Sequence, residues 1–96
     1  MSYPQQSLAE GFTGAEFATW SEASQNSYIE TSVTMAGVVF TQTHLGKASC
    51  VNDWYFADDA WKTRNSDIRD AIAAYRDAHP SGVILALIIR ECGALD

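Results

Sequence analysis

The chain has two cysteines, Cys50 and Cys92, and whether they join limits its possible folds more than any other feature of the sequence. Neither belongs to a Cys-x-x-Cys pair, and their spacing from the two histidines matches no zinc-site pattern. Two alternatives remain, a pair of buried thiols or one disulfide. A bridge between residues so far apart would remove about 4 kcal/mol of unfolded-state entropy, a large share of a small domain's stability. We therefore expect the disulfide, which places the protein in an oxidising compartment.

Acidic residues outnumber basic ones, twelve to six, for a formal charge of −6. Such a surface repels phosphate backbones and anionic lipid heads, so a nucleic-acid partner is not expected. The longest aliphatic run, residues 83–89, is too short to span a bilayer, so membrane insertion is not expected either. The charge suits a cationic protein partner, although keeping the domain soluble is the simpler explanation.

The length of 96 residues fits one domain. Residues 1–11 contain Pro4 and show no periodicity, so we expect a flexible N-terminal lead-in followed by a single helical domain over residues 12–96. The lead-in has no basic start and no apolar stretch, unlike a signal peptide. If the protein is secreted, we expect this to be its mature form, with the signal peptide removed.

A short helix is predicted at the start of the domain. Thr13 and Glu16 have the Ser/Thr-x-x-Glu spacing of a capping box, which marks a helix N-terminus. Large aromatic residues lie on both sides of this box. We expect three of them to turn toward the core: Phe12, Phe17 and Trp20.

A long helix is predicted next. Ser21 is its expected N-cap, because Glu22 follows and a carboxylate is favourable at the positive end of a helix. Apolar residues recur at the 3.6-residue period, which predicts helix through about Thr41 and an end within residues 43–46. Two neighbouring stripes form its predicted apolar face: Tyr28, Ser32, Met35 and Val39 on one, and Ile29, Val33, Ala36 and Phe40 on the other.

The middle of the chain is less regular. Apolar residues near Cys50, spaced at i, i+1, i+4 and i+5, favour a short helix through Tyr55. Residues 56–64 mix acidic and aromatic side chains without a clean period, so we expect mostly a loop there. Asn65 or Ser66 is then the expected N-cap of another helix.

The core face of that helix follows from its i, i+3, i+4, i+7 spacing: Ile68, Ala71, Ile72 and Tyr75. The His79-Pro80 pair is expected to stop it. A last helix is predicted over residues 82–92, with Ser81 as N-cap and Gly93 after its end. Its β-branched content leaves a strand possible, but the flanking Ser and Gly favour helix.

The last predicted helix is apolar on nearly every side, and such a helix belongs in the middle of a bundle. The predicted fold class is therefore all-α, a small bundle of four to five helices closed by one disulfide.

Acidic and aromatic residues gather in the predicted loop over residues 56–64. A glycosidase needs two carboxylates across a cleft and a calcium loop needs ligands at set intervals, and neither pattern is present. A solvated loop over aromatic core anchors is the simplest interpretation. Aromatic and charged residues also concentrate in interface hot spots, so the loop is the candidate partner-binding site. The candidate contact residues are Asp58, Asp59, Trp61 and Arg64.

No catalytic pattern is found in the sequence. The serines lack a Gly-x-Ser-x-Gly elbow, the scattered glycines form no phosphate-binding loop, and His44 and His79 have no nucleophile in a recognisable context. We therefore expect no enzyme activity, no cofactor and no metal.

The order of these features resembles the Rap1a/Tai immunity proteins of type VI secretion, which belong to the small periplasmic helical folds that include the HdeA acid-stress chaperones. The likeness covers roughly residues 12–93. It rests on pattern and spacing: the Thr-Gly-Ala-Glu-Phe segment at 13–17, Ser-Tyr-Ile at 27–29, Cys50, the apolar positions from Ile68 to Tyr75, His79-Pro80, the apolar run 83–89 and Cys92.

The resemblance implies a non-enzymatic periplasmic protein, a homodimer, that blocks a peptidoglycan amidase toxin by inserting a loop into its cleft. Only the two disulfide cysteines carry over residue by residue. An HdeA-like acid-stress chaperone is the alternative function, because twelve acidic residues permit opening as carboxylates become protonated. A structural domain without inhibitory role is the third.

Overall fold

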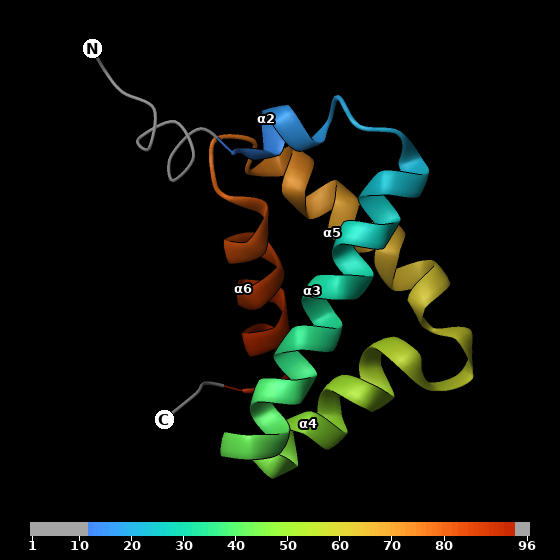
Figure 1. Ribbon diagram of the computed structural model, residues 1–96, viewed down its shortest axis with the longest axis vertical. Helices are drawn as coiled ribbons and strands as arrows, with labels where there is room; N and C mark the ends of the chain where they lie inside the picture. The colour runs from blue at the N-terminus through green and yellow to red at the C-terminus, as the bar shows by residue number, and fades with distance from the viewer. Residues whose placement is uncertain (1–11, 94–96) are drawn as a thin grey trace.

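A computed structural model describes residues 12–93, and within that range the chain forms helices joined by short turns, with no strand (Figure 1). This confirms the all-α class. The lead-in predicted over residues 1–11 lies outside the described residues. The elements are α2 (Gly14–Phe17), α3 (Glu22–Thr43), α4 (Leu45–Val51), the π-helix η1 (Asn52–Phe56), the 3-10 helix η2 (Ala57–Asp59), α5 (Trp61–Ala74) and α6 (Pro80–Cys92).

The predicted disulfide joins Cys50 and Cys92 across a Cα–Cα distance of 5.8 Å, which confirms that expectation. It ties the end of α6 to α4. Beside it, Lys47 Nζ donates to the Cys92 carbonyl oxygen at 3.3 Å. The last helix is therefore fixed at its C-terminal end to the middle of the chain.

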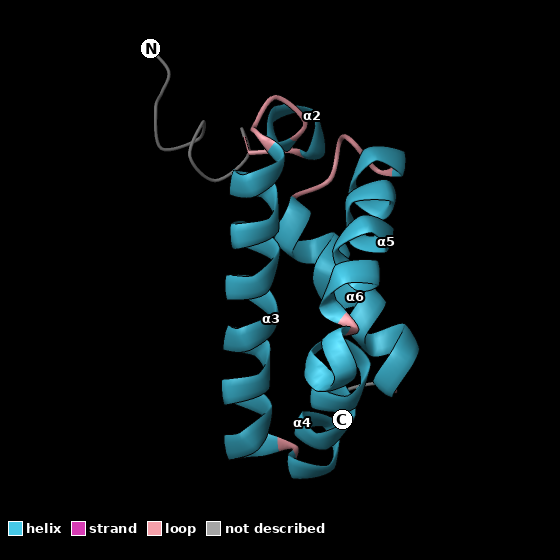
Figure 2. Cartoon of the chain, turned by 90° about the vertical axis from the view of Figure 1, so that its right-hand side faces the viewer, coloured by secondary structure: helices cyan, strands magenta, loops and turns pink. Residues whose placement is uncertain are grey.

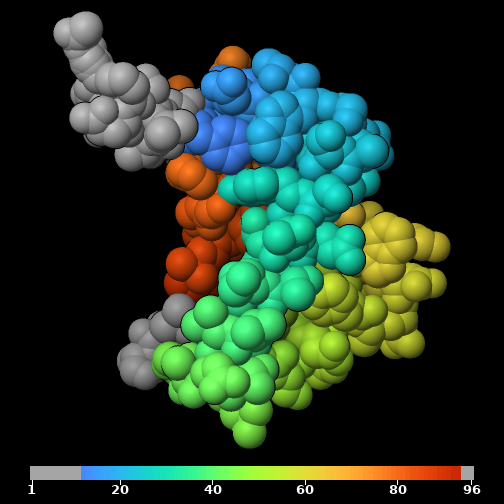
Figure 3. All heavy atoms as spheres, in the orientation of Figure 1, coloured from blue at the N-terminus to red at the C-terminus, as the bar shows by residue number. Residues whose placement is uncertain are grey.

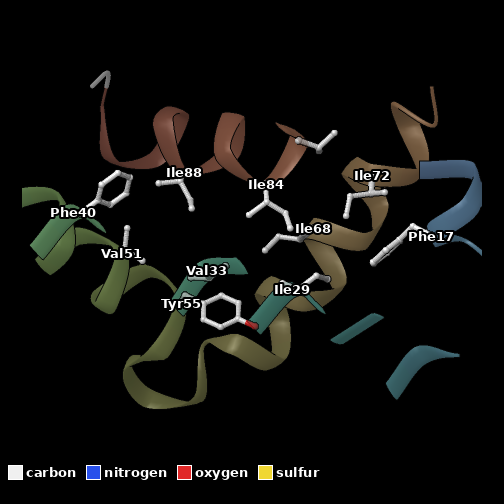
Figure 4. Packing of buried hydrophobic residues seen from close by; sticks show 11 residues of the cluster. Phe17, Ile29, Val33, Phe40, Val51, Tyr55, Ile68, Ile72, Ile84 and Ile88 are labelled. Carbon is white, nitrogen blue, oxygen red and sulfur yellow. The ribbon is translucent and has the colours of Figure 1, made fainter. Parts of the chain in front are cut away.

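The buried hydrophobic residues form one cluster between α3, α5 and α6, with α2, α4 and η1 closing its ends (Figure 4). A single contiguous core of this kind is what one small domain needs to offset its conformational entropy. Its members are Phe17, Ile29, Val33, Phe40, Val51, Tyr55, Ile68, Ile72, Val83, Ile84 and Ile88.

The short helix α2 begins as predicted, with the Thr13 hydroxyl accepting from the Glu16 amide at 3.4 Å. It lies against α5, and the Gly14 amide donates to the Ala78 carbonyl oxygen, in the turn that follows α5, at 3.0 Å. A Cβ atom at Gly14 would come within 2.7 Å of the Ile72 carbonyl oxygen. Glycine therefore permits the close approach of α2 to α5.

Helix α3 has the predicted N-cap, Ser21, and continues to Thr43. Only His44 separates it from α4, so the break predicted over residues 43–46 is shorter than expected, and the helix expected near Cys50 begins earlier. The stripe that contains Ile29 and Val33 is buried. The prediction for the neighbouring stripe is wrong at two of its members, Met35 and Val39, which are exposed.

The loop predicted over residues 56–64 is wrong, because η2 fills residues 57–59 and α5 already begins at Trp61. Asn65 is not an N-cap but lies inside α5, buried. Its Oδ1 atom accepts a hydrogen bond from the Tyr55 hydroxyl, which satisfies a polar side chain in the core. Tyr75 was also placed wrongly, since α5 ends at Ala74 and the Tyr75 ring is exposed.

The N-cap of α6 is His79 rather than the predicted Ser81. The His79 Nδ1 atom accepts from the Ser81 amide at 3.1 Å, and Pro80 takes the first helical position, where its missing N–H costs nothing. Tyr28 and Ser81 join their hydroxyls, which links the start of α6 to α3. No helix within residues 12–93 is long and apolar enough to cross a membrane.

Helix α6 packs on α3, α4 and α5 with its inner side (Figure 2), while its outer side is open (Figure 1). Val83, Ile84 and Ile88 face the core, and Leu85 is exposed. The expectation that α6 lies in the middle of the bundle is therefore wrong, because an apolar helix here covers one flank of the core and leaves apolar side chains outside.

Candidate partner-binding corner

The candidate site lies where η1 turns into α5, on the side of the molecule away from α6 (Figure 1). We call residues 56–61 the corner. Three of the four predicted partner-binding residues belong to it: Asp58, Asp59 and Trp61. Arg64 lies one helical turn further on. In the space-filling view the corner, in yellow, protrudes from the body of the molecule (Figure 3).

The backbone of the corner is strained at two consecutive residues. Asp58 has φ 55° and ψ 36°, and Asp59 has φ 62°, so both are in the left-handed region. Aspartate tolerates this region better than most residues with a side chain, but each such residue still costs of order 1 kcal/mol. Two in succession reverse the chain between η1 and α5 and point an acidic pair outward.

A buried hydrogen bond between η1 and α5 stabilises the corner. Tyr55, at the end of η1, donates from its hydroxyl to Asn65 in α5, and both residues are buried. Burial raises the pKa of Tyr55 to about 12, and the negative charge of Glu30 adds to this rise. The phenol therefore stays neutral, as a hydrogen-bond donor, well above neutral pH.

Arg64 forms a second support. Its Nε atom donates to the Trp54 carbonyl oxygen at 2.9 Å, and its guanidinium carbon lies 5.6 Å from the centre of the Trp54 ring. Its other side faces Asp67, with a nitrogen–oxygen distance of 3.7 Å. These contacts fix η1 to α5. Arg64 therefore holds the corner in place and leaves the residues before it exposed to solvent.

The exposed surface of the corner combines acid with aromatic rings. Phe56 and Trp61 are 36% and 40% exposed, one on each side of the aspartate pair. Lys62 lies over the Trp61 ring at 5.6 Å and 3.9 Å from the Asp59 carboxylate. Because both partners of that ion pair are largely exposed, the pair is screened by water and weak. A bound partner can therefore replace it with a stronger ion pair.

The side chains exposed at the corner are of the kinds that bind other molecules. Within residues 12–93, no group of three His, Cys, Asp or Glu side chains could hold a metal ion. The corner instead offers two carboxylates and two half-exposed rings on a braced turn. Aromatic residues of this kind dominate binding energies at protein interfaces, and fixed carboxylates select cationic partners.

The sequence singled out this segment as the candidate site, and that choice stays a prediction, but the form of the segment was predicted wrongly. The true start of α5 is not apparent from the sequence, because Asn65, which lies inside the helix, is of a residue type that commonly caps helices. The left-handed pair had one available signal, the adjacent Asp58 and Asp59, since aspartate is among the few residue types found in that region. Comparisons with models of known protein families, with curated proteins and with solved structures find no match.

Proposed function

We propose that this protein is a periplasmic immunity-type binding protein that blocks a peptidoglycan amidase toxin by placing its corner in the toxin's cleft. One observation carries the proposal: Asp58 and Asp59 stand in consecutive left-handed conformations between two half-exposed aromatic rings. Strained backbone of this kind concentrates at functional sites, because in an ordinary loop nothing offsets its free-energy cost.

The supports beneath the corner are consistent with a rigid inhibitor. The Tyr55–Asn65 hydrogen bond and the Arg64–Trp54 contact fix the turn before any partner arrives. A turn that is already ordered loses little entropy on binding, which favours affinity. The carboxylate pair and the formal charge of −6 would speed association with a cationic cleft.

In this proposal the protein does no chemistry of its own. It excludes substrate by filling the cleft, with Trp61 as the anchor and the carboxylates as steering charges. The Cys50–Cys92 disulfide suits the oxidising periplasm, where thiols are kept oxidised.

The test is direct binding to cell-wall amidases, measured by calorimetry together with inhibition of peptidoglycan cleavage. We expect Trp61→Ala to weaken binding by at least about tenfold, a typical loss for an aromatic anchor. Tyr75→Ala is the matched control, because Tyr75 is also an exposed ring but lies at the opposite end of α5 from Trp61. Equal effects of the two substitutions, or no binding to any amidase, would count against the proposal.

An acid-stress chaperone is the second candidate, favoured by the apolar side chains left exposed on α3, among them Met35 and Val38. Such a protein would shield unfolding clients when its carboxylates become protonated. Aggregation of a client protein at about pH 2, where carboxylates are neutral, distinguishes the two. A lack of protection there removes the chaperone function.

A further inference from the structure

A groove runs along α6, between this helix and the end of α5. Its volume is about 400 Å³, which lies within the range of small-molecule sites in proteins. Among residues 12–93, eight line it, and six of these are Ala, Gly, Val or Leu. The other two are Tyr75 and Arg90. An apolar groove with a few polar groups that fix the orientation of a ligand is the usual form of a binding site.

The two polar residues stand at the two ends of the groove. Arg90 belongs to the last turn of α6, whereas Tyr75 lies in the turn between α5 and α6. Gly82, Ala86 and Arg90 are spaced at i, i+4 and i+8, so they form one stripe about 12 Å long. An extended chain advances about 1.2 Å per bond, as the extended polypeptide backbone does. A chain of about ten bonds therefore fills the groove.

Between its two ends, the groove offers a ligand no hydrogen bonds. The lining side chains there are hydrocarbon, and the α-helical backbone of α6 is already hydrogen-bonded within the helix. An extended peptide laid in the groove would lose water from its amide and carbonyl groups without gaining partners, which is costly. A hydrocarbon chain has no such groups. The lining therefore favours a hydrocarbon chain over an extended peptide.

Arg90 gives the groove a positive end. Its side chain is 70% exposed, and its Nε and Nη2 atoms each lie 3.3 Å from the same carboxylate oxygen of Glu91. An exposed ion pair contributes little to stability, so an incoming anion can replace it. The planar guanidinium matches a carboxylate, to which it donates two parallel hydrogen bonds. This end of the groove therefore favours a carboxylate.

The net charge of the chain disfavours a membrane as the source of that carboxylate. At a formal charge of −6 the molecule is repelled by the many anionic heads of a bilayer surface. A free ligand brings only one negative charge, so its repulsion is much smaller. Its hydrocarbon chain then supplies most of the affinity.

We propose that the groove between α5 and α6 binds a single-chain fatty acid, with its carboxylate at Arg90 and its chain lying over Ala86 and Gly82 toward Tyr75. The Tyr75 ring, which is 65% exposed, then covers the methyl end of the chain. This site is separate from the corner, which lies on the side of the molecule away from α6 (Figure 1). It does not depend on the proposed function.

The test is a titration of the oxidised full chain with sodium decanoate, below its micelle concentration, followed by amide shifts in NMR spectra. We expect saturable shifts confined to residues 71–90. Each methylene between hexanoate and decanoate should tighten binding about twofold, about half the effect of complete burial, because one side of the groove faces water. Dodecanoate should gain no more, since its chain passes the end of the groove. Shifts spread over the whole chain, or an affinity that keeps rising, would overturn the proposal.

A cationic amphiphile of the same chain length tests the role of Arg90. Decyltrimethylammonium should bind more weakly than decanoate, although the formal charge of −6 favours the cation at long range. Arg90→Gln should weaken decanoate binding by about tenfold and remove this preference. Arg76→Gln is the matched control, because it removes the same charge at an exposed position outside the groove. Equal losses in the two arginine variants would overturn the proposal.

A bulky side chain in the groove tests the path of the chain. Ala86→Phe adds a ring at an exposed position in the middle of the groove and should abolish decanoate binding. If this variant unfolds, Arg90→Gln still decides the question. Two results would assign the groove to another occupant and overturn the proposal. One is binding to anionic vesicles without binding to free decanoate, and the other is tighter binding of a short apolar peptide at the same residues.

Discussion

At the scale of single residues, Tyr55 and Asn65 carry more of the architecture than their sequence context suggests. A tyrosine and an asparagine ten positions apart read separately as an apolar anchor and a helix cap. In the fold they are one buried hydrogen bond between η1 and α5. Sequence periodicity cannot reveal such a pair, because it reports which residues face inward and not which polar atoms meet there.

Stability should fall at alkaline pH because of Tyr55. The ordinary pKa of tyrosine is about 10, and burial raises the pKa of Tyr55 to about 12 in the folded state. The unfolded chain therefore loses this proton first, so the contribution to stability is full below pH 10 and is lost as the pH rises toward 12. Urea unfolding at a series of pH values measures it.

The Tyr55→Phe variant is the control for that experiment. It should lack this part of the alkaline decline and should be less stable at neutral pH by about 1–3 kcal/mol, because Asn65 loses its partner. An unfolding free energy that declines equally in both proteins would contradict the assignment to Tyr55.

The strain at the corner should be measurable in the same way. Asp58→Gly should raise the free energy of unfolding by about 0.5–1 kcal/mol, because glycine adopts the left-handed region without steric cost. Asp53→Gly, in the right-handed η1, should lower it by a similar amount. If the corner binds a toxin as proposed, Asp58→Gly should also weaken that binding although it stabilises the fold. A destabilised Asp58→Gly would mean that the turn is not strained.

At the scale of elements, the helices with strong local signals were predicted well. Thr13 and Ser21 are N-caps as expected, since capping depends on side chains next to the helix they start. The N-cap of α5 was placed five or six residues too late, at Asn65 or Ser66, because Ala60, the true N-cap, has no capping side chain. Periodicity predicted the existence of α6 but not its place. The same apolar pattern is compatible with a helix in the middle of a bundle and with a helix on the flank of the core.

The packing of α2 on α5 depends on Gly14, and substitution there should be costly. In Gly14→Ala the added Cβ would lie 2.7 Å from the Ile72 carbonyl oxygen, closer than real contacts allow. We expect a loss of about 1–3 kcal/mol in the free energy of unfolding, typical of overpacking.

Gly37→Ala is the matched comparison, because a Cβ at Gly37 meets no atom within 4 Å inside a helix. It should stabilise the protein by about 0.5–1 kcal/mol. Chemical denaturation of both variants decides the matter, and a neutral Gly14→Ala would show that α2 can shift away from α5 without loss.

At the scale of the whole molecule, the acidic corner lies on the side away from α6 (Figure 1). If the corner binds a toxin as proposed, its carboxylates predict a response to salt, because the Debye length falls from about 10 Å at 0.1 M to about 3 Å at 1 M. Toxin binding through Asp58 and Asp59 should weaken as salt rises.

Calorimetry of toxin binding across a salt series measures this response. Binding that does not change with salt would mean that the carboxylates at the corner do not steer the association.

The whole-molecule arrangement was only partly predictable from the sequence. The fold class and the disulfide followed from local patterns and from the size of the chain. The candidate site was found as a segment, but its left-handed turn and the clamp by Arg64 depend on contacts between η1 and α5. The exposure of Met35 and Val39 was missed because these residues extend the buried stripe of α3 in sequence.

The Cys50–Cys92 bond also restricts how two chains can associate. Many small helical proteins form dimers by exchanging a terminal helix, which swings out and docks on the other copy. Here α6 is covalently held at its far end and hydrogen-bonded to Tyr28 at its near end, so it cannot be handed over while the disulfide is intact. Two chains that associate after the disulfide has formed must therefore associate in their folded form, and they should dissociate without unfolding.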